Sequence, residues 1–272
     1  MIRPTSFLRI FVLLALLLPS AAAAHSFWLQ PVDHTPEAGE EVRIEFKVGD
    51  AGDVNDWGLY WERIAALRLF GPDGVSDQQR GIRVTAGEEP GSALIAVAKP
   101  GTHILAFASN PSFSDLEAER FDRYVEHEGL SAIAQHRAAL GQGRGNGKEL
   151  YARRAKTLLQ VGDAHTDNAT RPIGQTLEIV PLTNPFALDP GAPLKLQILW
   201  RGEPLAGAQL LAAPLDATGD YESFRSDANG MVKAPAPVGA AMLYSAVWGV
   251  PAPNDARADY FTIFASLTVG TR

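Results

Sequence analysis

The chain has 272 residues, of which 46% are hydrophobic and 20% are charged, and its formal net charge at pH 7 is −7. It contains no cysteine, which excludes disulfides, thiolate metal sites and cysteine nucleophiles. The chain has no stripe of clustered Lys and Arg. We therefore expect no nucleic-acid partner, because binding to phosphates needs clustered positive charge.

The first 24 residues are ordered like a secretory signal peptide. Arg3 and Arg9 precede an apolar run over residues 10–18, and small residues then lead to Ala24, which is the order of charged region, apolar region and cleavage site. The apolar run is about half the roughly 20 residues that a membrane-spanning helix needs. We expect cleavage before His25, a periplasmic mature protein and no transmembrane segment after cleavage. A retained N-terminal anchor is the alternative.

Residues 25–162 have the pattern of a β-sandwich domain. Short runs rich in Val, Ile and Leu are separated by Pro and Gly turns such as Gly71-Pro72-Asp73-Gly74. Short strands with turn residues at the joints are typical of sandwiches. The predicted strands are Glu41–Val48, Ala65–Phe70, Ser92–Ala98 and Thr102–Ala108.

A helical insertion is predicted within this domain at about residues 114–140. Ser114 and Glu117 have the spacing of a capping box, and the apolar residues after them recur at helical spacing. A second short helix is predicted over 131–140, and a glycine-rich flexible loop over 141–147. Strand character returns at Lys156–Val161.

The C-terminal part is predicted as a polar linker over 163–175 and a second β-sandwich over 176–272. Leu194, Leu196 and Ile198 alternate with polar residues, which indicates an antiparallel sheet with one solvated face. The predicted strands are Thr176–Val180, Leu194–Trp200, Gln209–Ala213, Met231–Ala234, Ala241–Val247 and Phe264–Val269. The predicted fold class is thus all-β, with two Ig-like or transthyretin-like sandwich domains and a short helical insertion in the first.

Several short motifs are spread over nearly the whole mature chain. They are His25-Ser26-Phe27-Trp28-Leu29-Gln30-Pro31, Phe121-Asp122-Arg123-Tyr124, Leu177-Glu178-Ile179-Val180-Pro181, Gly202-Glu203-Pro204-Leu205-Ala206-Gly207 and Asp227-Ala228-Asn229-Gly230. Together they resemble the DUF4198 family of exported proteins, which includes periplasmic components associated with nickel and cobalt uptake transporters. The resemblance implies a transition-metal ligand, nickel or cobalt first, and a membrane metal transporter as partner.

The mature N-terminus offers metal chemistry of its own. If His25 is the first residue, its α-amino group and imidazole can chelate one ion together, and the amide of Ser26 can join them for copper or nickel. These ligands suit late divalent metals in general, so copper and zinc remain possible ions. The alternative is that His25 is only the exposed first residue of a strand.

Two further histidines are candidate metal ligands. His103 lies in a predicted strand on the same face as Leu105 and Phe107, where a satisfied core histidine is the alternative. His127 stands between two glutamates at a predicted helix end, where a solvated surface position is the alternative. In relatives the strand near this family's last motif commonly ends in His-Met, but here Trp248-Gly249 occupies the corresponding place. If that histidine is a metal ligand in relatives, this chain lacks the ligand.

The sequence predicts a non-catalytic protein, a periplasmic metal-binding accessory. Gly147-Lys148 lacks the rest of a P-loop, and neither a G-x-S-x-G elbow nor an H-E-x-x-H helix occurs. One alternative is a β-sandwich protein-interaction module without metal. A weaker alternative is a copper mono-oxygenase whose histidine brace combines His25 with His103.

Overall fold

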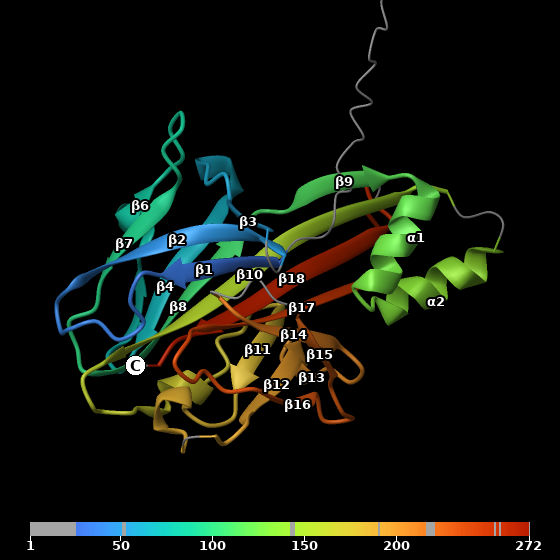
Figure 1. Ribbon diagram of the computed structural model, residues 1–272. Coiled ribbons are helices and arrows are strands. Elements are labelled where there is room, and N and C mark those ends of the chain that lie inside the picture. The colour runs from blue at the N-terminus through green and yellow to red at the C-terminus, as the bar shows by residue number, and fades with distance from the viewer. Residues whose placement is uncertain are drawn as a thin grey trace, which may run out of the picture.

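The computed structural model describes residues 26–50, 53–141, 145–189, 191–215, 221–252, 254–255 and 257–271. In these ranges the chain is mostly β-strand, and the helices are α1 (Ala118–His127) and α2 (Ser131–Leu140). The strands form sheets that lie one above another, with the helices at one end (Figure 1). The prediction of a mostly-β chain is confirmed. Within the described ranges, no helix combines the length and the apolar character needed to cross a membrane.

The middle sheet runs through the whole molecule. Among the described residues its strands are β4 (Ile64–Gly71), β5 (Gly74–Asp77), β8 (Gly101–Ser109), β9 (Ser112–Leu116), β10 (Gly147–Val161), β14 (Gln209–Pro214), β15 (Glu222–Arg225), β17 (Met242–Pro251) and β18 (Tyr260–Val269). At its centre, β10 pairs antiparallel with β8 and parallel with β18. The segments 25–162 and 176–272, which we predicted as separate domains, therefore contribute strands to one sheet.

One face of the middle sheet is covered by a smaller sheet. Its strands are β1 (Ser26–Pro31), β2 (Glu41–Asp50), β3 (Asp53–Asp56), β6 (Ile82–Arg83) and β7 (Ser92–Ala96). On β2 the apolar residues Val42, Ile44 and Phe46 alternate with polar ones and are buried, as expected for a strand with one face in the core. They pack against Leu105 and Phe107 of β8 in one apolar core.

The opposite face is covered by the third sheet, formed by β11 (Leu177–Pro181), β12 (Leu194–Trp200), β13 (Glu203–Pro204) and β16 (Met231–Ala234). Leu194, Leu196 and Ile198 of β12 are buried against the middle sheet, which confirms the alternation seen in the sequence. Arg201 and Gly202 join β12 to β13 with φ of 54° and 86°. Two positive values are typical of a type I′ hairpin turn.

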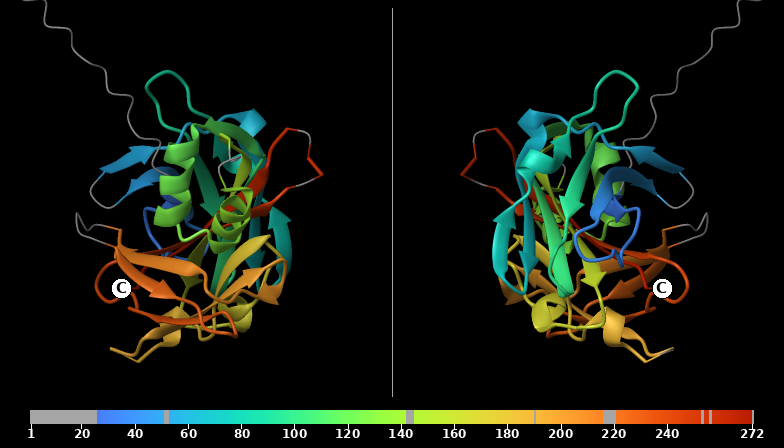
Figure 2. Two further views of the ribbon diagram at one scale, coloured as in Figure 1. Left: turned by 90° about the vertical axis from the view of Figure 1, so that its right-hand side faces the viewer. Right: turned by 90° about the vertical axis from the view of Figure 1, so that its left-hand side faces the viewer.

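The helices cover the end of the middle sheet that the smaller sheet leaves open, and Figure 2 shows them at that end. Phe121 and Tyr124 of α1 and Ile133 of α2 pack against Tyr260 and Phe264 of β18. On α1, Phe121, Tyr124 and Val125 recur at helical spacing, so this helix buries one apolar stripe. The buried side chains of α2 are those of Ile133 and Arg137.

The predicted capping box does not form. Ser114 lies in β9, where it pairs with Glu149 of β10, and α1 begins at Ala118 after Glu117, whose side chain makes no capping hydrogen bond. Pairing in the sheet uses the backbone of Ser114, so this residue cannot also start a helix.

Strand β10 is longer than predicted. We expected its start at Lys156, but it begins at Gly147, inside the segment predicted as a flexible loop. Its first half carries Glu149, Arg153 and Arg154, so the apolar pattern that marks strands is absent there. Strands on both sides, β9 and then β8 on one and β18 on the other, hold this half in the sheet.

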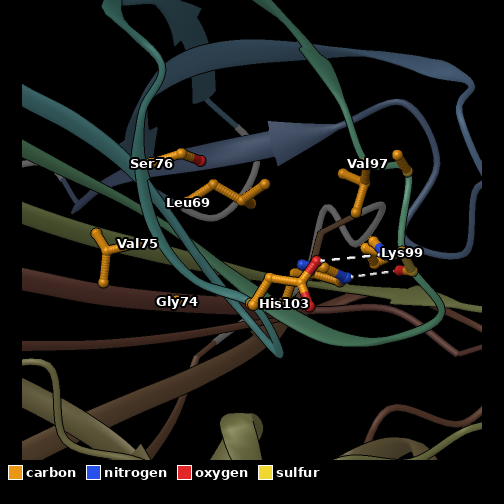
Figure 3. A pocket seen from close by; sticks show the side chains of 10 residues that line it. Leu69, Gly74, Val75, Ser76, Val97, Lys99 and His103 are labelled. Carbon is orange, nitrogen blue, oxygen red and sulfur yellow. Dashed lines mark hydrogen bonds and ion pairs between the residues drawn. The ribbon is translucent and has the colours of Figure 1, made fainter.

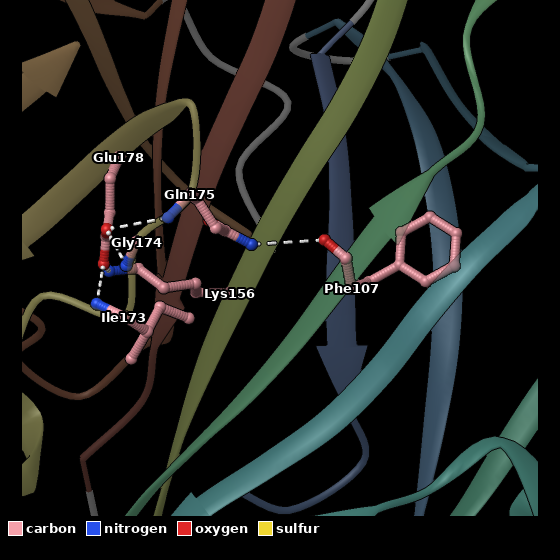
Figure 4. A network of polar contacts seen from close by, with 6 residues as sticks. All are labelled: Phe107, Lys156, Ile173, Gly174, Gln175 and Glu178. Carbon is pink, nitrogen blue, oxygen red and sulfur yellow. Dashed lines mark hydrogen bonds and ion pairs between the residues drawn. The ribbon is translucent and has the colours of Figure 1, made fainter. Parts of the chain in front are cut away.

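The end of the predicted linker is fixed to the core by a buried ion pair (Figure 4). Lys156 Nζ lies 2.9 Å from Glu178 Oε1, and both side chains are almost fully buried. The same carboxylate accepts the backbone N–H groups of Ile173, Gly174 and Gln175 at 2.8–3.1 Å. The pair therefore connects β10 of the middle sheet to β11 and to the residues that lead into it.

Candidate functional site

His103 is held as a neutral core histidine. Its Nε2 lies 2.8 Å from the carbonyl oxygen of Lys99 and donates to it, while its Nδ1 is buried without a hydrogen-bond partner (Figure 3). A Cβ atom placed on Gly71 would stand only 2.4 Å from Nδ1, so the imidazole lies directly on that backbone. Burial lowers the pKa of His103, and the hydrogen bond to Lys99 only partly opposes this. Neither ring nitrogen is presented to a metal ion.

A small surface hollow of about 180 Å³ lies beside this histidine. Leu69 and Val97 give it apolar walls. At its rim, Lys99 Nζ is 3.7 Å from Asp73 Oδ2, and both side chains are about two-thirds exposed. An ion pair so exposed contributes little binding energy, so the hollow has no strong chemical feature apart from the covered His103.

His127 is placed at the far end of α1. Its side chain is 70% exposed, and its Nδ1 lies 3.0 Å from Oε1 of Glu128, which is buried. The backbone oxygen of His127 accepts a hydrogen bond from Gln209. The solvated imidazole of His127 thus lies against the buried carboxylate of Glu128.

The structure does not bring His103 and His127 together. His103 pairs with Leu159 near one end of β10, whereas Tyr124 of α1 contacts Glu149 near the other end. Ten strand positions separate these points on β10, which corresponds to about 33 Å. The two histidines therefore do not share an ion.

His25 lies outside the described residues, but its neighbour Ser26 is well placed. The Ser26 hydroxyl is 3.0 Å from that of Ser245 on β17, and Ser26 is 9% exposed. Ser245 lies opposite Ser266, then Ala155, then Phe107 across the sheet. Three strand spacings and four residues along β8 separate it from His103, roughly 19 Å in all. His103 is thus remote from the start of β1.

Among the described residues, no three His, Asp or Glu side chains are grouped so as to hold a metal ion. A transition-metal site built only from the described part of the chain would therefore lack donors.

A buried carboxyl group that the sequence did not indicate lies under the helices. Glu149 at the start of β10 is 4% exposed, and Tyr124 Oη lies 3.4 Å from its Oε2. Burial raises the pKa of Glu149 to about 7, and the negative charge of Glu128 adds to the rise. The Tyr124 and Thr262 hydroxyls oppose it, although Thr262 makes no hydrogen bond of normal geometry. A carboxyl group that titrates near neutral pH is a recognised sign of a functional position.

The raised pKa of Glu149 predicts a stability that falls with pH. The folded state keeps this proton up to about pH 7, whereas an unfolded glutamate loses it near pH 4.5. The contribution is therefore complete below pH 4.5 and is lost as the pH rises through about 7, by about 3 kcal/mol. Urea unfolding at pH 5 and pH 8.5 should show this loss in the wild type and not in Glu149→Gln. Equal losses in both proteins would contradict the prediction.

The family model described as "Domain of unknown function (DUF4198)" matches residues 22–247. No curated protein matches the chain. Two solved structures align with it at low similarity. The D0-D1 domain of Intimin has 9% identity and a TM-score of 0.20, with 89% of this chain and 97% of that chain covered. Trypsin-activated alpha-2-macroglobulin from Escherichia coli has 12% identity and a TM-score of 0.21, with 92% of this chain and 16% of that chain covered. TM-scores this low transfer neither fold nor function.

Proposed function

Since this chain belongs to the DUF4198 family, whose function is unassigned, we propose a function from its own residues. The protein is an exported, non-catalytic metal-binding accessory that holds a transition-metal ion through His25 after cleavage behind Ala24. Its location is the periplasm. Nickel and cobalt are the first ions to test, copper and zinc come next, and the partner is a membrane metal transporter.

The observation that carries this proposal is the anchoring of Ser26. Its side chain is almost fully buried and is hydrogen-bonded to Ser245 of the middle sheet. In addition, Ser26 to Pro31 all pair with β2. Ser26 is therefore a fixed attachment point, and this supports a proposal in which the ion is bound next to β1.

The placement of His103 supports a binding role over a histidine-brace enzyme. Such a brace needs two histidines on one ion. His103 lies roughly 19 Å from Ser245, and both of its ring nitrogens are covered. The proposal therefore assigns no metal contact to His103.

Calorimetric titration of the chain beginning at His25 with nickel, cobalt, copper and zinc tests this proposal. We expect binding of at least one ion, and a loss of affinity of at least about tenfold, or 1.4 kcal/mol, when the α-amino group of His25 is acetylated. N-terminal acetylation removes the α-amino nitrogen as a donor but leaves every side chain in place. His103→Gln serves as a histidine control and should bind like the wild type.

Two outcomes would contradict the proposal. If no ion binds to the chain beginning at His25, the protein-interaction alternative becomes the better account. If binding is equally tight after N-terminal acetylation, the N-terminal amine is not a ligand. In that case a lower metal affinity of the His103→Gln variant would place the site on β8.

A further inference from the structure

Arg153 of β10 carries a positive charge into a box of aromatic side chains. Its Cζ lies 5.6 Å from the ring centroid of Phe27, 5.5 Å from Trp57, 5.2 Å from Tyr151 and 5.8 Å from Phe264. These rings come from β1, β10 and β18 and from the residue that follows β3. Four distant parts of the chain thus meet around one guanidinium.

This guanidinium has no acidic partner among the described residues. Its Nε is buried without a hydrogen-bond acceptor. Burial lowers the pKa of Arg153, and a second cation, Arg63, lowers it further. Tyr151, which also hydrogen-bonds to the guanidinium, and Tyr124 oppose this shift of the pKa. Among the residues that the structure describes, no ion pair includes Arg153 or Arg63.

Arg63 increases the positive charge at the same place. Its Cζ lies 5.4 Å from the centroid of the Trp57 ring that Arg153 also contacts, and 5.1 Å from that of Tyr60. Tyr60 and its neighbour Trp61 are 39% and 55% exposed. A second cation, Arg63, therefore connects the buried box to aromatic residues at the surface.

We propose that Arg153 is the binding group for the carboxylate of a small organic acid, whose apolar part lies against the aromatic side chains of this box. A guanidinium presents paired N–H donors in a planar fork that matches a carboxylate. Cation–π contacts offset part of the cost of burying the charge, but they supply no acceptor for Nε–H. A carboxylate oxygen supplies it.

The aromatic walls favour an organic anion over inorganic phosphate. Small-molecule sites are mostly apolar, with a few polar groups that fix the orientation of the ligand, and this box has that composition. The inference goes beyond the proposed metal site, because neither Arg153 nor the rings around it act as metal ligands. Phe27 follows Ser26, so the aromatic box lies next to the anchored start of β1.

Titration with benzoate, in the presence of a chelator that removes metal ions, tests this inference. We expect benzoate to bind to the chain beginning at His25 at least tenfold more tightly than benzamide, which has the same shape without the charge. Inorganic phosphate should bind at least tenfold more weakly than benzoate. The Arg153→Met variant should lose at least tenfold in benzoate affinity, and Arg153→Lys should retain part of it.

Arg154→Met is the matched control. Arg154 is the next residue of β10, so its side chain points to the opposite face of the strand, and it donates to the carbonyl oxygens of Ser109 and Arg153. This variant should bind benzoate like the wild type. In the wild type, the Nε–Hε signal of Arg153 should shift in NMR spectra as benzoate is added, which tests the contact even if Arg153→Met fails to fold.

Three results would overturn the inference. They are benzoate and benzamide binding equally, benzoate affinity unchanged in a folded Arg153→Met variant, and no shift of the Arg153 signal. Tighter binding of phosphate than of benzoate would assign the site to inorganic anions instead. Because metal ions are absent from this titration, its failure is independent of a failure of the N-terminal chelate.

Discussion

Replacing Glu178 with Gln is expected to lower the free energy of unfolding by about 3–5 kcal/mol, because it removes one partner of a buried ion pair. Lys156 and Glu178 are each 1% exposed, so water does not compensate the ammonium group once the carboxylate is gone. The substitution preserves side-chain volume, and no cavity contributes to the loss.

The backbone groups around Glu178 add to this effect. The carboxylate accepts N–H groups of Ile173, Gly174 and Gln175 in addition to Lys156 (Figure 4). A glutamine side chain has one acceptor oxygen and one donor nitrogen. Its NH₂ group would therefore face N–H donors, which leaves buried donors without acceptors.

Replacing Lys156 should lower the free energy of unfolding less than replacing Glu178. In Lys156→Met the carboxylate keeps its three backbone donors, so we expect about half the loss seen in Glu178→Gln, roughly 2 kcal/mol. Urea unfolding at pH 7 measures both. Glu222→Gln, at an exposed position of β15, is the control and should lie within about 0.5 kcal/mol of the wild type. A larger loss for Lys156→Met than for Glu178→Gln would contradict this account.

The sequence predicted the strands well where one face is apolar. Leu194–Trp200 coincides with β12, and Met231–Ala234 coincides with β16, because alternation reports directly which side chains face the core. It did not predict that β18 pairs in parallel with β10. Alternation shows that a strand has one buried face, but it does not show which strand pairs with it. Two separate sandwiches were therefore predicted, whereas strands from both segments form one sheet.

The candidate sites depend even more on distant contacts. In the sequence, His103 is a candidate metal ligand because of its residue type. In the structure its Nδ1 is covered by the backbone of Gly71, which belongs to another strand. Nothing in the sequence marks Arg153 or Glu149 as a buried functional residue, since charged residues outside an apolar pattern are usually solvated. Their burial comes from Phe27 and from Tyr124, which are far from them in the chain.

Gly147→Ala is the second substitution with a large expected effect, a loss of about 2–4 kcal/mol through overpacking. A Cβ atom on Gly147 would stand 1.9 Å from Cγ of Phe121, so one of the two must move. Phe121 is fully buried and stacks on Tyr260, with ring centroids 5.2 Å apart. It also contacts Tyr124 edge-on. The ring has no free space, and we expect α1 to be pushed away from β10.

Thermal and urea unfolding of Gly147→Ala measure this effect, and Gly145→Ala is its matched control. Gly145 lies two residues earlier, and a Cβ atom there meets nothing within 4 Å, so the control should match the wild type within about 0.5 kcal/mol. The double variant Gly147→Ala with Phe121→Leu should be less destabilised than the sum of the two single variants, because the smaller side chain makes room for the methyl group. Additive losses would mean that the two residues do not collide, and α1 would then owe its position to other contacts.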